Sequence, residues 1–238
     1  LFTRGHRGVV LTEAGRLLFE AATESTRRIR DCLGEISAVE AGRRQIAVVT
    51  DYGFGAAWLM ERLSDFERLC PGVEVQIVTT RNLSETVSGD FRPDVSILFE
   101  AGPIREDDPV FQRKMLFQEE VYPVCGRNYL ERHGPFDSLE EIRKAHLLHL
   151  KGDGTLWLNW ENWFRNEVVD SAQARNSRLN VFRTFSHFPL LMQSACQDEG
   201  IALGWRPLVD KALESGQLVK LWPTPAKSEN GYVLTLHR

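Results

Sequence analysis

Polar and aromatic side chains stand at the points where predicted β-strands of this chain end. Such positions can hold a small molecule, because ligands of open α/β sheets bind beyond the carboxyl ends of the strands. Where a strand gives way to a helix, free backbone N–H groups add further hydrogen-bond donors. The candidate ligand-binding residues are Thr50, Asp51, Tyr52, Thr79, Thr80, Arg81, Phe99, Glu100, Thr184, Ser186, Gly204 and Trp205.

Several of these candidates also have simpler interpretations, which the sequence leaves open. Thr50 or Asp51 can cap the helix that follows, and capping is compatible with ligand contact. Arg81 and Glu100 are equally well explained as solvated charges at a rim. For Trp205, packing is slightly favoured over lining a cleft.

Three tryptophans, Trp157, Trp160 and Trp163, are spaced i, i+3 and i+6, which places them along one face of a predicted helix. Packing is the stronger interpretation of this pattern. The sharper hypothesis is an aromatic site that holds a cation by cation–π attraction. Asp51 and Glu100 would add negative charge to such a site, which then predicts a zwitterionic or quaternary-ammonium ligand.

Patterns that would indicate catalysis or metal binding are weak. His146 and His149 would point to opposite faces of a predicted strand. Ser186 precedes His187, but the G-x-S-x-G elbow of many hydrolases is missing. The four cysteines are far apart and form no C-x-x-C motif. We therefore expect no catalytic residues, no metal and no cofactor, and we expect the reduced thiols of a cytoplasmic protein.

Strands alternate with helices through the body of the chain, which is typical of an α/β sheet built from parallel βαβ units. The predicted strands are 46–50, 73–79, 94–99, 121–125, 147–150, 178–183, 201–204, 218–222 and 231–238. The predicted helices are 56–69, 82–88, 137–145, 156–165, 188–196 and 207–214. Two similar sets of elements predict two Rossmann-like lobes with a cleft between them.

The front of the chain follows a different pattern. Residues 1–11 predict a β-hairpin whose tip carries Arg4, His6 and Arg7. Thr12 can cap a long helix that would end near Gly42. The single apolar stripe of this helix needs a partner surface, and a second copy of the same helix is the economical choice.

The composition is that of a globular protein, with 42% hydrophobic and 26% charged residues. The net charge is -4, but the first 44 residues carry more basic than acidic side chains, which suits DNA contact at one end of the molecule. No apolar run approaches the ~18–20 residues of a membrane span, and no secretion signal is evident. A first residue of Leu1 rather than Met favours a piece of a longer protein.

Several segments resemble the LysR-type transcription regulators. LFTRGHRGVVLTEAG (1–15) is similar to the wing and linker-helix start of that family, whose pattern is L-F-x-R-x-x-R-G-V-x-L-T-x-A-G. The first sensor helix and the second strand of the family are resembled by AAWLMERLSDFERLCPGVEVQI, and its third strand is resembled by DVSILF. The crossing into the second lobe is resembled by EEVYPVCGRNYL. LLHLKGDGTLWLNWENWF is similar to a stretch of the subgroup that includes glycine-cleavage and β-lactamase regulators. GIALGWRPLVDKALESGQLVKLW resembles the end of the second lobe, so the resemblance covers essentially the whole chain.

The resemblance implies a domain organisation and partners. Two lobes like those of periplasmic binding proteins would hold a small effector between them. Arg4 and Arg7 would approach DNA, while the recognition helix would lie before Leu1 and a last helix beyond Arg238. A dimer or tetramer would form, with promoter DNA and a small effector as the other partners. The implied domains are a remnant of a winged helix-turn-helix (1–11), a linker helix (12–44), lobe I (46–116 with 227–238) and lobe II (117–226).

Two other classes of protein remain open. A solute-binding protein of the transport class shares the two-lobe fold, and a small α/β enzyme would turn its ligand over. Neither explains residues 1–42. The sequence therefore favours a cytoplasmic transcription regulator, not an enzyme, that senses an amino-acid-like, betaine or choline-type metabolite.

Overall fold

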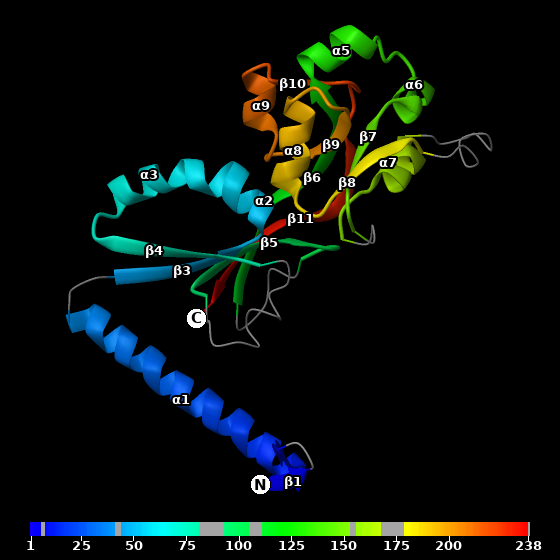
Figure 1. The fold of residues 1–238 in the computed structure, drawn as a ribbon. Helices are drawn as coiled ribbons and strands as arrows, with labels where there is room; N and C mark the ends of the chain where they lie inside the picture. The colour runs from blue at the N-terminus through cyan, green and yellow to red at the C-terminus, as the bar shows by residue number, and fades with distance from the viewer. Residues whose placement is uncertain are drawn as a thin grey trace.

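The computed structural model describes residues 1–5, 8–40, 44–80, 93–104, 111–152, 156–167 and 179–237. A long helix extends away from an α/β body, and the short hairpin lies at the far end of that helix (Figure 1). The α/β class predicted from the alternation of strands and helices is confirmed.

The hairpin consists of β1 (Phe2–Gly5) and β2 (Gly8–Leu11), paired antiparallel. Helix α1 (Glu13–Glu40) follows, and its 28 residues span about 42 Å at ~1.5 Å per residue. Thr12 caps it as predicted, because its Oγ1 accepts a hydrogen bond from the backbone N–H of Gly15 at 3.1 Å. Gly15 also lets the hairpin approach, since a Cβ there would lie 2.0 Å from the carbonyl oxygen of Leu1.

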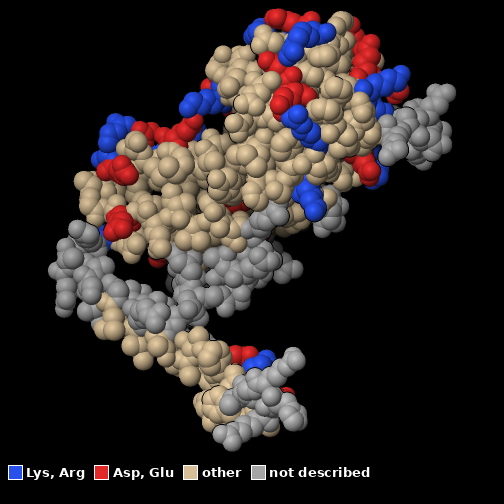
Figure 2. Space-filling model, in the orientation of Figure 1, with Lys and Arg blue, Asp and Glu red and all other residues tan. Residues whose placement is uncertain are grey.

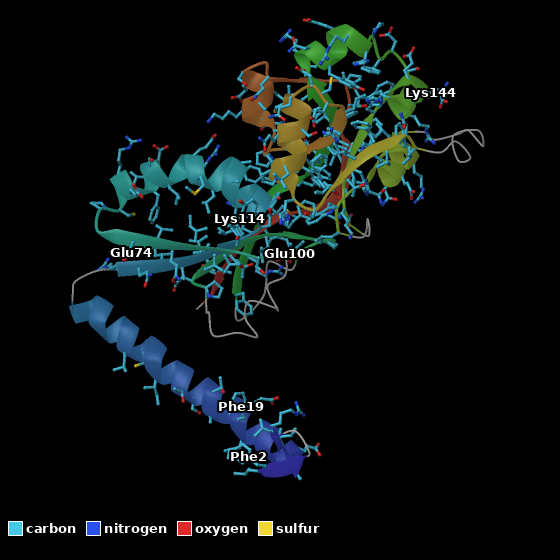
Figure 3. All side chains as sticks on the ribbon, in the orientation of Figure 1. Phe2, Phe19, Glu74, Glu100, Lys114 and Lys144 are labelled. Carbon is cyan, nitrogen blue, oxygen red and sulfur yellow. The ribbon has the colours of Figure 1, made fainter. Side chains whose placement is uncertain are left out.

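The described side chains of α1 and the hairpin are largely exposed, and many are apolar. Phe2 on the hairpin and Phe19 on the helix lie toward the end farthest from the body (Figure 3), with 67% and 59% of their surfaces exposed. The space-filling view shows mainly uncharged surface along the described part of this helix (Figure 2). This surface lacks cover from the body of its own chain.

The body begins with three strands that run parallel to one another: β3 (Arg44–Thr50), β4 (Val73–Thr79) and β5 (Val95–Glu100). Between β3 and β4 lies a continuous helical stretch made of α2 (Tyr52–Phe54), the π-helical turn η1 (Gly55–Leu59) and α3 (Met60–Leu69). This stretch begins four residues before the predicted helix 56–69, because Asp51 caps it. The helix predicted for 82–88 lies outside the described residues.

The second part of the body holds the remaining elements. Its strands are β6 (Phe111–Gly126), β7 (Leu147–Leu150), β8 (Val181–Phe185), β9 (Ile201–Trp205), β10 (Leu218–Lys220) and β11 (Ala226–His237). Its helices are α5 (Arg127–His133), α6 (Leu139–Lys144), α7 (Trp160–Glu167), α8 (Phe188–Cys196) and α9 (Asp210–Glu214). Strand β7 and helix α8 have the predicted bounds.

All the strands of the body belong to one sheet, in the order β4-β3-β5-β11-β6-β9-β7-β8, with β10 paired to β6. The predicted parallel pairing holds only within two groups of strands, β4-β3-β5 and β8-β7-β9. Between these groups, β11 runs antiparallel to β5 and β6, and β6 runs antiparallel to β9. The 16-residue strand β6 is far longer than the predicted 121–125. Strands β6 and β11 therefore continue from one part of the body into the other.

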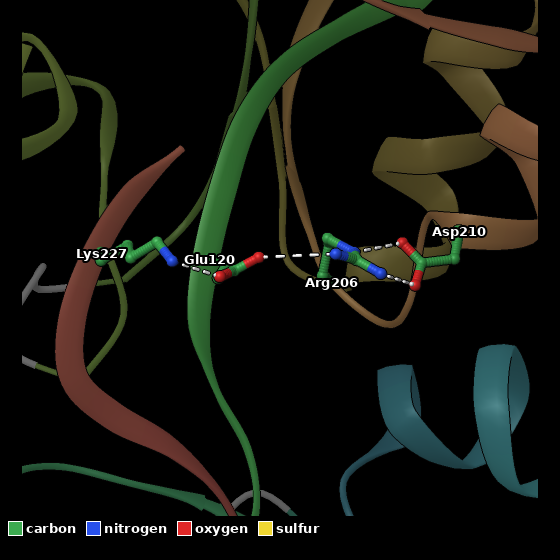
Figure 4. Close-up of polar contacts among 4 residues, drawn as sticks. All are labelled: Glu120, Arg206, Asp210 and Lys227. Carbon is green, nitrogen blue, oxygen red and sulfur yellow. Dashed lines mark hydrogen bonds and ion pairs between the residues drawn. The ribbon is translucent and has the colours of Figure 1, made fainter. Parts of the chain in front are cut away.

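A chain of charged side chains joins β6, β11 and the start of α9. The Glu120 carboxylate lies 2.6 Å from Lys227 Nζ and 3.6 Å from Arg206 Nη1, and Arg206 in turn makes a bidentate contact with Asp210 (Figure 4). The hydrogen bonds to Asp210 raise the pKa of Arg206, and the nearby negative charge of Glu120 makes a smaller contribution in the same direction. The hydrophobic core of the body includes Trp160 and Trp163, and both side chains are almost wholly buried.

Candidate functional site

A cavity of about 220 Å³ lies where the carboxyl ends of strands from both parts of the body meet. Strands β3, β4 and β5 end at one wall, and β7, β8 and β9 end at the other. This is the location that the strand-end rule predicts for a ligand site. The lining residues are Asp51, Tyr52, Gly53, Thr79, Thr80, Phe99, Leu150, Trp157, Ser186, His187, Phe188, Trp205, Leu208 and Tyr232.

Most of the candidate ligand-binding residues come together at this cavity. They come from five separate stretches of sequence, and no two of these stretches are closer than about twenty residues along the chain. The candidates that line the cavity are Asp51, Tyr52, Thr79, Thr80, Phe99, Ser186 and Trp205.

Two candidates support the cavity wall from behind instead of lining it. Thr50 is fully buried, and its hydroxyl donates to the Ile97 carbonyl oxygen at 2.9 Å. It therefore joins β3 to β5 directly below Asp51. Gly204 lies in β9, where a Cβ would come within 2.9 Å of Val209 Cγ1, so its role is close packing.

The three remaining candidate ligand-binding residues do not line the cavity or lie outside the described residues. Glu100, at the end of β5, forms an ion pair with Arg113 and is absent from the lining (Figure 3). Thr184 is exposed on β8 and pairs with His149 across the sheet. Arg81 lies outside the described residues.

Sequence reasoning missed several lining residues. Trp157 was assigned to a helix face, but α7 begins at Trp160, so Trp157 lies before the helix and borders the cavity. Phe188 starts α8, two positions beyond the predicted Ser186. Tyr232 comes from β11, and no strand-end signal marks it, because it lies inside the strand. The other missed residues are Gly53, Leu150, His187 and Leu208.

Asp51 is the acidic residue of the lining. Its Oδ1 accepts a hydrogen bond from the Phe54 backbone N–H at 2.9 Å, which caps α2. Its Oδ2 is shielded from water and has no hydrogen-bond partner among the described residues. The hydroxyl of Tyr232 and the backbone N–H of Gly53 are further donors close to the carboxyl group, and together with the Phe54 N–H they favour its ionised form. Burial raises the pKa of Asp51, and these neighbours only partly oppose the rise.

Aromatic rings form much of the remaining wall. Phe99 contacts Trp157 and Tyr232, with ring centroids 5.9 and 5.2 Å apart. Phe188 meets Trp205 edge to face, with centroids 5.9 Å apart. Burial raises the pKa of Tyr232 well above its ordinary value, so its phenol stays neutral. The cavity thus combines neutral aromatic surface with one carboxyl group.

Glu119 holds two parts of this wall in place, although it is 1% exposed and lies behind it. Its Oε1 accepts hydrogen bonds from Trp205 Nε1 at 2.8 Å and from the Leu158 backbone N–H at 3.1 Å. Its Oε2 accepts from the hydroxyl of Ser228. A single carboxylate therefore positions Trp205 of β9 and the segment that carries Trp157.

The residues first considered for catalysis or metal binding are dispersed. The ring of His146 stacks on Phe182 with centroids 4.4 Å apart, and burial lowers the pKa of His149. No group of three or more metal-binding side chains occurs among the described residues. Within the same described part of the chain, no helix is long and apolar enough to cross a membrane.

The two arginines predicted to contact DNA belong to the hairpin. Arg4 lies in β1 opposite Val9, but its side chain lies outside the description, as does the whole of Arg7. Their role in DNA contact stays a prediction.

The fold and the cavity define a small-molecule-binding domain with an α/β body whose strand ends meet at one site. A model of the LysR substrate binding domain matches residues 39–238, and the chain belongs to this family. It therefore contains the effector-binding domain of a LysR-type transcription regulator.

Curated relatives and solved structures agree with this assignment. The glycine cleavage system transcriptional activator of Escherichia coli K12 is 25% identical over all of this chain and 72% of its own length. The regulator DsdC of the same strain is 26% identical over 92% of this chain and 67% of its own.

Two solved structures show a similar fold. The effector domain of AmpR of Pseudomonas aeruginosa has a TM-score of 0.59 and is 19% identical, and the match covers 82% of this chain and 86% of that one. CrgA of Neisseria meningitidis, a LysR-type transcriptional regulator, has a TM-score of 0.63 and is 20% identical, and the match covers 100% of this chain and 76% of that one.

Proposed function

We propose that this chain is the sensor of a bacterial transcription regulator that binds a small metabolite in the cavity and responds by changing its contact with promoter DNA. The observation that carries the proposal is the cavity itself. Seven candidate residues from strand ends in both parts of the body line one cavity. A ligand that contacts both walls has different affinities for different arrangements of those walls, and only such a difference can shift a conformational equilibrium.

The two parts of the body act as the lobes, 46–116 with 227–238 and 117–226. They are connected through β6, whose residues span the boundary between the lobes, and through β11, which pairs with β6 and with β5. A change in their relative tilt would reach the front of the chain through β3, whose first residue, Arg44, lies just beyond α1.

Helix α1 pairs two copies of the chain in a dimer or a tetramer. The exposed apolar side chains on this helix support the pairing, since Leu17, Leu18 and Ile29 are each more than half exposed. A dimer places two DNA-binding regions side by side, so an inverted-repeat operator is expected. Arg4 and Arg7 would contact its phosphates or minor groove.

Two rival functions are less well supported. A transport-type solute-binding protein would need neither the hairpin nor α1, and the relatives reported above are named as transcription regulators. An enzyme is the second rival, since Ser186, His187 and Asp51 all border the cavity, but the family and the relatives reported above are transcription regulators. The site fits binding without turnover, in a regulator that works beside DNA in the cytoplasm.

The test uses the complete gene product and the promoter DNA upstream of its own gene. DNA affinity and the DNase I footprint are measured with and without a small-molecule extract of the source cells. The extract should change the affinity or the footprint. A Thr79→Trp variant should lose the response, because the new indole occupies the cavity that Thr79 lines.

Thr184→Trp is the matched control. It introduces the same bulk at an exposed threonine that lies outside the lining, so it should respond as the wild type does. An equal response from both variants would show that the cavity is not the sensor.

A further inference from the structure

One carboxylate oxygen of Asp51, Oδ2, makes no hydrogen bond to the described residues, although the hydroxyl of Tyr232 lies close to the carboxyl group. Oδ1 is used by the Phe54 N–H at 2.9 Å, while Oδ2 is shielded from water and has no partner among the described residues. A buried acceptor without a partner is costly. The carboxyl group borders the cavity, so a ligand bound there can provide the missing donor.

The charge of the lining points in the same direction. Asp51 is acidic, and neither lysine nor arginine occurs among the lining residues. Arg113, which lies nearby on β6, is already paired with Glu100. Among the described lining residues, an anionic ligand would therefore meet a carboxylate without a compensating guanidinium or ammonium group, whereas a cation would neutralise that carboxylate in a site of low dielectric.

The aromatic wall suits a cationic group as well. Phe99, Trp157 and Tyr232 form a connected cluster of rings beside Asp51, and aromatic faces attract cations. A quaternary ammonium ion would satisfy the rings but has no N–H, so Oδ2 would stay unpaired. A primary or secondary ammonium ion satisfies both the rings and the oxygen.

We propose that the ligand of this cavity is a small protonated primary or secondary amine, whose N–H group donates to Asp51 Oδ2 while its carbon atoms pack on the aromatic wall. The proposal rests on the function proposed above and narrows the chemical class of the effector. It replaces the broader expectation of a zwitterionic or quaternary-ammonium ligand with the requirement for an N–H donor. Thr79, Thr80 and Ser186 line the rest of the cavity and can contact a polar group on the same molecule.

The test is isothermal titration calorimetry with matched sets of probes. Each set contains a small primary amine, its N,N,N-trimethyl analogue and the counterpart in which a methyl group replaces the amine, with carbon bodies from ethyl to phenylethyl and with the free amino acids as a further series. At least one amine should bind, and it should bind about tenfold or more tightly than both counterparts, because hydrogen bonds to charged groups are strong.

Asp51→Asn is the decisive variant, because asparagine caps helices as well as aspartate does and should leave the fold intact. It should weaken amine binding by about tenfold or more. Glu67→Gln, at an exposed position on α3 outside the lining, removes one negative charge in the same way and should leave binding unchanged.

A pH series separates this proposal from a protonated Asp51 that donates to an anionic ligand. Amine affinity should rise as Asp51 ionises, whereas an anion would lose affinity over the same range. Tighter binding of the methyl or trimethyl counterparts, amine binding that Asp51→Asn leaves unchanged, or no binding of any amine would each overturn the proposal. The function proposed above would survive those results if the extract still changed DNA binding in the wild type and not in Thr79→Trp.

Discussion

Asp51 caps a helix with one carboxylate oxygen and leaves the other without a partner inside the protein. Capping alone is satisfied equally well by asparagine. The charge of Asp51 therefore lowers the stability of the ligand-free protein. A destabilising residue of this kind is expected where the residue serves ligand binding more than stability.

We expect Asp51→Asn to stabilise the ligand-free protein by about 1 kcal/mol, because it removes a buried charge that lacks full compensation. This corresponds to a midpoint roughly 2–4 °C higher in thermal unfolding. Because the folded state raises the pKa of Asp51, wild-type stability should fall as pH rises from the unfolded-state value through the folded-state value. Above that window it should level off.

Asparagine does not titrate, so the stability of Asp51→Asn relative to the wild type should increase as pH rises from the unfolded-state pKa of Asp51 through its folded-state pKa. Thermal unfolding of both proteins in a pH series measures the effect. A variant that is less stable than the wild type at neutral pH would contradict this explanation.

A second residue-scale prediction concerns Glu119, which accepts hydrogen bonds from Trp205 Nε1 and the Leu158 N–H. Glu119→Leu should lower the free energy of unfolding by about 3 kcal/mol, since it leaves these buried donors unpaired. Glu119→Gln keeps an acceptor oxygen and should cost much less. Urea unfolding compares the two, and equal losses would show that the negative charge, which both variants remove, and not hydrogen bonding makes Glu119 important.

Helix α5 shows, at the scale of elements, why local sequence did not reveal the whole fold. Its N-cap residue, Gly126, has no side chain to cap it. Asp198, from the turn after α8, supplies the cap and accepts hydrogen bonds from the Tyr129 N–H at 3.1 Å and from Asn128 Nδ2 at 2.8 Å. Since the capping signal lies about seventy positions away in sequence, no pattern within 127–133 announces the helix.

Replacing Asp198 should therefore destabilise an element that is distant in sequence. Asp198→Ala should cost about 1–2 kcal/mol, the usual penalty for losing a cap. Its backbone φ of 60° adds to the penalty for alanine. Asp198→Asn keeps the cap and tolerates that conformation. Urea denaturation, with hydrogen exchange at Tyr129, provides the measurement, and unchanged exchange in Asp198→Ala would contradict the assigned role.

Elements whose information is local were predicted closely. Strands β4 and β7 and helix α8 have the predicted bounds, because turn residues or proline mark their ends. Strands β6 and β11 were predicted too short, since their length depends on mutual pairing across the sheet. Tyr232 escaped prediction as a site residue, and packing was favoured for Trp157, for the same reason: tertiary contacts alone bring them to the cavity.

The extended helix α1 dominates the shape of the molecule (Figure 1), and the large apolar side chains that the structure describes on it are exposed. Leu18 and Ile29 lie on one face at helical spacing, and 53% and 62% of their surfaces are exposed. Placing charge on that face would disrupt a pairing of two helices.

We expect Leu18→Glu with Ile29→Glu to shift the chain from dimer to monomer in sedimentation velocity at micromolar concentration. Thr23→Glu, on roughly the opposite face of α1 at 3.6 residues per turn, should leave the dimer intact. Dimers that persist in the double variant would place the contact between copies elsewhere on the molecule.

The central claim is that the cavity binds a metabolite and releases it unchanged. A thermal-shift screen of this chain against small metabolites, followed by recovery and mass analysis of each hit, tests that claim most directly. A ligand at about 100 times its dissociation constant should add about 2.7 kcal/mol to native stability. The account predicts at least one selective stabilising compound that is recovered intact and no longer stabilises Thr79→Trp. A hit that is chemically converted, or one that stabilises Thr79→Trp equally well, would contradict it.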